Sequence, residues 1–293
     1  MNQIVRNVLN RQLTKTQRAF VAQTVGQVRF TLNAIRRDNL ALLGLFIVIF
    51  HILVAVFAPV LAPYDPQTAI TTADGIGKSL YPPSAAHPFG TTTASHDVLS
   101  QWIYGSRISI FVGLFSGATV MVIGTTVGLI SGYYKGVTDV VLMRIVDILY
   151  GTPVIPLILI LALLVGGSIW NIFLAFGIIL WRGTARVVRS QTLSLSEREF
   201  VKAARATGAS ESRIIFLHIA PNVFSLVMIQ TIITIGAAIS LEAALSFLGV
   251  GVQDAVSWGT MLQMTFATGA IRTAWWWVLP PGISITLIVV SLF

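Results

Sequence analysis

The sequence predicts an all-α, polytopic membrane protein with six transmembrane helices. Its 293 residues are 55% hydrophobic and only 10% charged, whereas soluble domains carry about 25% charged residues. Six apolar runs can enter a bilayer, which takes about 20 residues per helix. Lys and Arg are concentrated in alternate connections, as on the cytoplasmic side of membrane proteins. The net charge of +8 therefore reflects topology and lipid headgroups, and no nucleic-acid partner is expected.

The expected spans follow one another with short and long connections between them. In chain order they are residues 40–61, 108–130, 140–165, 169–181, 223–248 and 275–293. The first ends before Pro63. Pro153 and Pro156 should kink the third, because proline removes a helical hydrogen bond. The fourth continues beyond Trp181 with three arginines on one helical face, whose charged ends should reach the inner membrane boundary: Arg182, Arg186 and Arg189.

Two parts are expected along the chain. Residues 1–39 should form a cytoplasmic basic tail, and apolar residues at helical spacing from Val21 predict an amphipathic helix in the membrane interface. A disordered basic tail is the alternative. Residues 40–293 should form the transmembrane domain, with outer loops at residues 62–104 and 249–274. His87 and His96 in the first loop lack a third ligand nearby, so no metal site is expected.

Small residues recur at every fourth position of the second span, at Gly124, Gly128 and Gly132. Such a row lets two helix backbones approach closely within a membrane. We therefore expect this face to pack against another helix. The alternative is a set of glycines that the helix tolerates without contact.

A polar island at residues 190–222 separates the fourth and fifth spans. Its first part, from Glu199, consists of good helix formers and stops at Gly208, a residue suited to a helix C-cap. Ser210 can start a second short helix. Pro221 leads the chain back into the membrane. The island is therefore expected to be two short helices and a turn on one membrane face.

This island resembles the EAA loop of ABC-importer permeases. The match consists of Ala203, Ala204, Gly208 and Pro221 at the family spacing. Residues 87–109 and 241–262 also resemble segments of this family. The closest likeness is to the C-type permease subunit of dipeptide, oligopeptide and nickel importers.

The resemblance implies the fold of a type I ABC-importer permease, in which the island is a coupling helix that docks on a separate ATPase subunit. The chain departs from the family pattern at Lys202, where glutamate is common, and at Ala220, where leucine is usual. Family members continue past the position of Phe293 with a short polar tail. The residues that the resemblance assigns to coupling are Glu199, Lys202, Ala203, Ala204, Arg205, Gly208, Ala209 and Pro221.

The resemblance also implies partners. They are a B-type permease subunit, which forms a heterodimer with this chain, two ATPase subunits and an extracytoplasmic substrate-binding protein. ATP and Mg would be bound by the ATPase subunits, so no cofactor or metal is expected in this chain. The implied cargo is di- and oligopeptides, with nickel chelates, glutathione or another small solute as alternatives. The implied location is a prokaryotic inner membrane, with the N-terminus in the cytoplasm.

Three charged residues within the expected spans are candidates for a pathway or structural role. Arg144 and Asp147 are three positions apart and share a helix face. Because unpaired charges are costly in a membrane, we expect them to pair with each other or with another helix. Glu242, near the outer end of the fifth span, leaves two interpretations open. It faces the pathway or the binding protein, or it forms an ion pair or a helix-end hydrogen bond.

No motif in the sequence points to catalysis. It has no complete Walker motif, no His-Glu-x-x-His, no Gly-x-Ser-x-Gly and no cysteine. A secondary transporter would show inverted repeats and broken helices with ion ligands, and a membrane-embedded enzyme would need clustered His, Asp or Glu. The sequence shows neither pattern, so a transport subunit driven by partner ATPases is the favoured interpretation.

Overall fold

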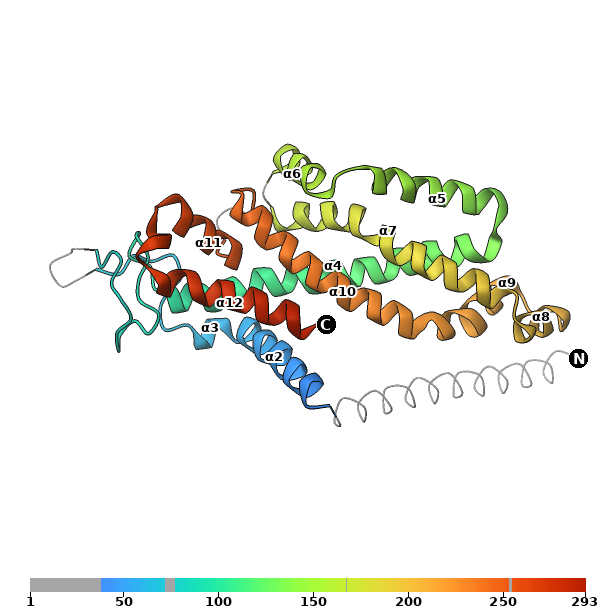
Figure 1. Cartoon of the computed structure of the whole chain (residues 1–293), viewed down its shortest axis with the longest axis horizontal. Helices are drawn as coiled ribbons and strands as arrows, with labels where there is room; N and C mark the ends of the chain where they lie inside the picture. Colours follow the sequence, from blue (N-terminus) through green and yellow to red (C-terminus); the bar gives the residue numbers. More distant parts are fainter. Residues whose placement is uncertain (1–37, 72–76, 167, 253–254) are drawn as a thin grey trace, which may run out of the picture.

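The chain folds into an elongated bundle of helices (Figure 1), as expected for an all-α membrane protein. The computed structural model describes residues 38–71, 77–166, 168–252 and 255–293. The predicted interfacial helix in the basic tail falls outside the described residues. The helical elements are α2 (Asn39–Val56), α3 (Ala58–Leu61), α4 (Val98–Tyr134), α5 (Gly136–Gly151), α6 (Val154–Val165), α7 (Ile169–Ser196), α8 (Glu199–Ala206), α9 (Glu211–Arg213), η1 (Ile214–Ile219), α10 (Ala220–Phe247), α11 (Trp258–Ala267), η2 (Ala270–Arg272) and α12 (Trp275–Ser291).

The longest elements of the bundle share one axis, and α4 lies among them. Its 37 residues correspond to about 55 Å at 1.5 Å per residue, which exceeds the hydrocarbon thickness of about 30 Å. Helices α7, α10 and α2 all pack against it. One end of α4 meets the loop of residues 62–97, which we call the loop end. The other approaches α8 and α9, which we call the knob end (Figure 1).

Glycines allow the neighbours of α4 to approach closely. A Cβ atom on Gly124, Gly128 or Gly132 would lie only 2.7–2.9 Å from a backbone carbonyl oxygen of α7. Gly113 and Gly117 face α10 in the same way, where a Cβ atom would meet isoleucine side chains at 2.4–2.6 Å. The predicted row of small residues thus lies at the α4–α7 contact, and a second row lies at the α4–α10 contact.

Helix α4 begins ten residues earlier than the span expected at residues 108–130. Asp97 is its N-cap, and its Oδ2 atom accepts hydrogen bonds from the backbone N–H of Ser100 at 2.8 Å and from the Ser100 hydroxyl at 2.7 Å. The other carboxylate oxygen lies 3.0 Å from Nδ1 of His87. An N-cap aspartate satisfies amides that the first helical turn leaves free. The prediction missed this start because residues 98–107 are too polar to count as a span.

The expected third span is not one kinked helix. Helices α5 and α6 meet at an angle of 91°. Thr152 has an extended backbone, with φ −99° and ψ 129°, as expected for a residue that precedes a proline. Pro153 is the N-cap of α6. The proline therefore ends one helix and starts another instead of bending a continuous one.

The count of spans in the structure differs from a simple six. Helices α2, α4 and α7 and the continuous run Glu211–Phe247 are each long and apolar enough to cross a membrane. The bent pair α5–α6 counts as a fifth crossing if its halves are taken together. The sixth expected span corresponds to α12, which has 17 residues and lies at the lower limit for a spanning helix.

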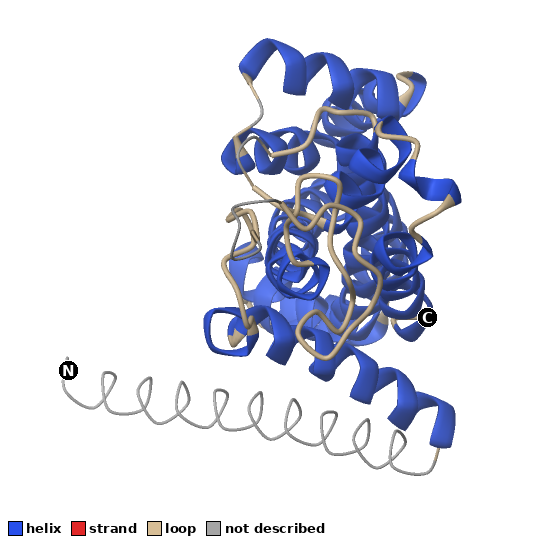
Figure 2. Ribbon diagram, turned by 90° about the vertical axis from the view of Figure 1, so that its left-hand side faces the viewer, coloured by secondary structure: helices blue, strands red, loops and turns tan. Residues whose placement is uncertain are grey.

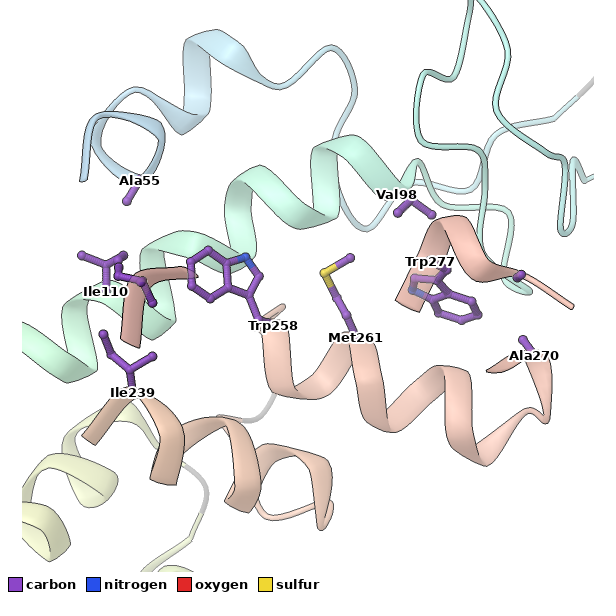
Figure 3. Close-up of a cluster of buried hydrophobic side chains, with 10 residues drawn as sticks. Ala55, Val98, Ile110, Ile239, Trp258, Met261, Ala270 and Trp277 are labelled. Carbon is purple, nitrogen blue, oxygen red and sulfur yellow. The ribbon is translucent and has the colours of Figure 1, made fainter. Parts of the chain in front are cut away.

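Beside the loop end, a buried core joins α2, α4, α10, α11 and α12. Figure 3 shows Trp258 and Met261 of α11 between residues of these helices. The expected outer loop of residues 249–274 thus contains α11, whose N-terminus carries a capping box formed by Ser257 and Thr260. Figure 2 looks onto this end, where the loops cross over the helices. The short α11 was missed because its ten residues are too few for a membrane span.

Candidate functional site

The knob, residues 197–213, begins with a short helix that ends at a left-handed glycine. Gly208 has φ +77°. Its N–H donates to the carbonyl of Arg205 at 3.0 Å, and the N–H of Ala209 donates to the carbonyl of Ala204 at 3.1 Å. This pair of bonds is a Schellman motif, which satisfies the last carbonyls of a helix. The sequence placed this cap at the correct residue.

The two faces of α8 differ sharply. Val201 is completely buried, and Ala204 and Ala209 pack against the same buried cluster. Phe200 is 42% exposed on the other face, where Ala203 is exposed too. The predicted coupling residues are therefore split between an inward face and an outward face.

The second helix of the island is not a separate short element. Ser210 has an extended backbone at the N-cap position of α9, although its side chain makes no capping hydrogen bond. The helix passes through the π-helical turn η1 directly into α10, and Pro221 lies in the first turn of α10. Proline is tolerated there because the first turn needs no backbone donor. The knob is thus continuous with a membrane-spanning helix, and single-turn π-helices of this kind often occur at functional sites.

Three contacts connect the knob with the end of α4. The guanidinium of Arg205 lies 5.8 Å from the centre of the Tyr133 ring. Tyr134 interacts with Glu211 of α9. The ammonium of Lys135 pairs with Glu197, and this hydrogen bond holds the pKa of the Glu197 carboxyl below its ordinary value. Arg205 therefore turns toward α4 rather than toward solvent alone.

Ion pairs also connect α7 with α5. Arg186 Nη2 lies 2.8 Å from Asp147 Oδ1, and Arg189 binds both carboxylate oxygens of Asp139. Arg144 is exposed and forms no ion pair with any described residue. Of the two arrangements that the sequence left open, the internal pair of Arg144 and Asp147 is therefore not formed, and Asp147 pairs with another helix.

The sequence predicted that the charged ends of Arg182, Arg186 and Arg189 reach the inner membrane boundary. In the structure, all three side chains also bind to α5. Arg182 donates to the carbonyl of Leu149 at 2.7 Å. The aromatic ring of Tyr150 lies 4.7 Å from the Arg182 guanidinium and 4.1 Å from that of Arg186. The spacing in the sequence gave no signal for these pairs, because Asp139 and Asp147 are eight residues apart in α5 and their partners Arg189 and Arg186 are three residues apart in α7.

Glu242 lies in the core between α4 and α10, and its side chain is 1% exposed. The Ser109 hydroxyl donates to Oε2 at 2.9 Å, and the Ser246 hydroxyl donates to Oε1 at 2.7 Å. No Lys or Arg of the described segments pairs with it. Hydroxyl donors compensate part of the cost of burying a carboxyl group. Glu242 thus joins two helices by hydrogen bonds and does not reach a surface.

Comparison with known proteins identifies the family. A model of the binding-protein-dependent transport system inner membrane component matches residues 124–293, and a model of the N-terminal transmembrane domain of oligopeptide transport permease C matches residues 29–83. The chain belongs to this permease family. It is a multi-pass membrane subunit of an ABC importer, and it is a transport component rather than an enzyme.

Several named relatives align over most of their length. A dipeptide transport system permease protein of Alkalihalophilus pseudofirmus is 38% identical over 90% of this chain and 84% of the relative. One from Bacillus subtilis is 34% identical over 96% of this chain and 86% of its own. An oligopeptide transport system permease protein of Bacillus subtilis is 39% identical over 77% of this chain and 73% of its own.

Within the described residues, no group of three or more His, Cys, Asp or Glu is arranged to hold a metal ion. His87 contacts Asp97 and a tyrosine ring, and both His87 and Asp97 are buried in the loop end. These histidine and aspartate side chains thus make structural contacts within the loop end. The knob remains the candidate functional site.

Proposed function

We propose that this permease forms half of a pathway for di- or oligopeptides. The relatives named for dipeptide and oligopeptide transport support this cargo. A glutathione transport permease of Pectobacterium atrosepticum, 37% identical over 75% of this chain, supports a modified peptide as the second candidate. Nickel chelates are a third candidate, from the resemblance alone.

We further propose that α8 is the coupling helix and that its outward face meets an ATPase subunit. Phe200, Lys202 and Ala203 would make this contact, because they are exposed while Val201 and Ala204 are turned toward the buried cluster. Aromatic residues, phenylalanine included, are enriched at the buried core of protein interfaces. Lys202 lies 3.7 Å from Glu199 within the same helix. The sequence assigned both Ala203 and Ala204 to coupling, and of these two we propose Ala203 for the docking face.

The remaining partners belong to the same proposal. A B-type permease subunit would complete the pathway, a second ATPase subunit would dock on that partner, and an extracytoplasmic binding protein would deliver peptide at the loop end. This arrangement places the knob and the N-terminus in the cytoplasm of a prokaryote, where ATP is available. ATP and Mg would be bound by the ATPase subunits and not by this chain.

The docking face is tested with Ala203→Asp, which places a charge where an aromatic and a methyl group would enter the partner. We expect normal membrane insertion and at least a tenfold loss of peptide-stimulated ATP hydrolysis in the reconstituted complex, since a tenfold change corresponds to about 1.4 kcal/mol. Val137→Asp, which adds the same charge at an exposed residue in the first turn of α5, outside the knob, is the control. Stimulation at the wild-type level in Ala203→Asp would contradict the proposal.

Gly208→Val tests whether the backbone geometry of the turn after α8 matters for docking, and it leaves the exposed side chains of α8 unchanged. No atom lies within 4 Å of a Cβ on Gly208, so the change adds no clash. It forces a β-branched residue into the left-handed region, which such residues adopt poorly. We expect weaker recovery of the ATPase subunits in a pull-down, with insertion unchanged. Full recovery would show that the turn geometry does not matter for docking.

A further inference from the structure

A large pocket opens at the loop end, away from the knob. Its volume is about 840 Å³, and its walls come from α2, the start of α4, the loop residues 65–67, the start of α7 and residues 255–256. Ala55 and Ile110 belong both to this wall and to the buried core that Figure 3 shows. The volume is within the range of about 300–1,000 Å³ that is typical of small-ligand sites.

The rim of this pocket is held in place by hydrogen bonds. The backbone N–H of Tyr64 donates to the Ser100 hydroxyl at 3.1 Å, and the Gln101 side-chain amide donates to the carbonyl of Pro66 at 3.1 Å. The side chains of Ser100 and Gln101 are both buried, and both residues lie in the first turns of α4. The segment that carries Asp65 is therefore fixed against α4 rather than free to move away from it.

Two opposite charges line a wall that is otherwise largely apolar. Arg107 extends from the open face of α4, where Phe111 and Leu114 are also exposed. Asp65 stands on the rim, and its Oδ1 atom accepts from the backbone N–H of Gln67 at 2.8 Å. Neither charge is in an ion pair with a described residue, and they do not pair with each other. Arg107 also lies over the ring of Tyr104, with its guanidinium 5.8 Å from the ring centre. The pocket thus offers one cationic and one anionic group in the same lining.

On the basis of the proposed peptide function, we propose that this pocket receives the peptide. Arg107 contacts the C-terminal carboxylate, and Asp65 contacts the N-terminal ammonium. A free peptide carries these two charges at opposite ends, and an arginine can bind a carboxylate through two parallel hydrogen bonds. The apolar wall accepts side chains of any sequence, because apolar contact imposes no hydrogen-bond pattern. Binding at this site would therefore depend on the charged ends of the peptide and not on the identity of its side chains.

An anionic lipid phosphate is the other chemistry that could meet Arg107. The two ligands make different demands on Asp65, which would repel a phosphate and attract the ammonium of a peptide. The experiment is therefore run in vesicles of neutral lipid and repeated with anionic lipid added. A loss that depends on the lipid, and not on the peptide ends, would overturn the proposal.

The test is a crossed comparison of variants and peptide ends in the reconstituted complex, with binding protein loaded to saturation. Arg107→Gln should slow transport of a free dipeptide at least about tenfold and leave transport of the same dipeptide amide at the wild-type value. Asp65→Asn should slow the free dipeptide and leave the N-acetyl dipeptide unchanged. Arg107→Lys should retain part of the transport, because it keeps the charge and loses the paired hydrogen bonds.

Arg272→Gln is the matched control, since Arg272 is exposed and lies outside the pocket lining. Copurification of the B-type permease and stimulation of ATP hydrolysis should stay normal in every variant. Equal losses for free and blocked peptides, or loss of the partner subunit, would show that Arg107 acts in assembly and would overturn the proposal. A wild-type complex that moves no dipeptide overturns the peptide function itself, which separates the two failures.

Discussion

At the residue scale, glycines determine how closely the helices of this permease approach one another. The row on α4 was visible in the sequence because fourfold spacing of glycine is a local pattern. The helix that packs against this row could not be predicted, because nothing in residues 124–132 indicates a contact with α7. The structure shows that backbone carbonyl oxygens of α7 occupy the space that a Cβ would need. Backbone atoms cannot turn aside as side chains can, so these positions tolerate no side chain.

Gly128→Ala tests this contact with the smallest available change. Its Cβ would lie 2.7 Å from the carbonyl oxygen of Ala185 and 2.7 Å from Cβ of Val188. Overpacking of this kind costs about 1–3 kcal/mol, and we expect a lower melting temperature and a lower yield of assembled complex. Gly151→Ala is the control, because no atom lies within 4 Å of its Cβ. Equal stability of the two variants would contradict the packing assignment.

His96 should make the loop end sensitive to acid. Gln101 lies 3.2 Å from its Nδ1 atom, and burial lowers the pKa of His96, while Asp65 opposes the shift. Because the folded-state pKa lies below the unfolded value of about 6.5, the fold favours neutral His96. This stabilisation is complete above that value and is lost as the pH falls through the folded pKa.

The measurement is the melting temperature of the purified protein at pH 7.5 and pH 5. We expect the wild type to lose stability at the lower pH and His96→Gln, which cannot titrate, to lose less. If His96→Gln loses as much stability at pH 5 as the wild type, His96 is not the cause of the sensitivity to acid.

At the element scale, the knob is connected to α4 as well as to α10. The sequence predicted α8 and its glycine cap, because both depend on local propensity and on one backbone conformation. It did not predict that Tyr133, Tyr134 and Lys135 would meet the knob, since these residues lie more than 60 positions earlier. Long-range contacts of this kind depend on how α4 and α7 pack, which no local pattern encodes. Movement of α8 would therefore act on two membrane helices at once.

The pair of Lys135 and Glu197 allows this connection to be tested by charge exchange. Lys135→Glu and Glu197→Lys should each lower the number of peptides transported per ATP hydrolysed by about two- to fivefold, because each replaces an attraction between α4 and the knob by a repulsion, and exposed pairs have small effects. The double variant should recover most of the loss, because it restores the attraction. Melting temperatures should hardly change. Losses that simply add in the double variant would show that the two residues do not act together.

At the scale of the whole molecule, the sequence predicted the helical class, the polar island and the order of apolar runs. It did not predict helices that are too polar or too short to be recognised as membrane spans. The polar start of α4 and the short α11 lack the apolar length of a span, and Pro153 divides the expected third span into two helices. The pocket beside Arg107 could not be foreseen, because its lining comes from five separate parts of the chain.

The orientation of the molecule can be measured directly, since the chain contains no cysteine. Ala85→Cys at the loop end and Ala206→Cys on α8 both introduce an exposed thiol. An impermeant thiol reagent added to intact cells should label the first and spare the second, because charge asymmetry places the knob inside. Disrupting the membrane should make both reactive. Labelling of Ala206→Cys alone in intact cells would reverse the topology.

The unbroken length of α4 has a consequence for the way the two membrane faces communicate. One helix runs from the Asp97 cap at the loop end to the tyrosines that contact the knob, so the partners proposed at the two faces would act on the same helix. Linkage then requires reciprocity. If binding of the loaded binding protein raises the affinity of the complex for ATP by some factor, ATP must raise the affinity of the complex for that binding protein by the same factor. The delivery protein should therefore be held most tightly when nucleotide is bound, and hydrolysis becomes the event that releases it.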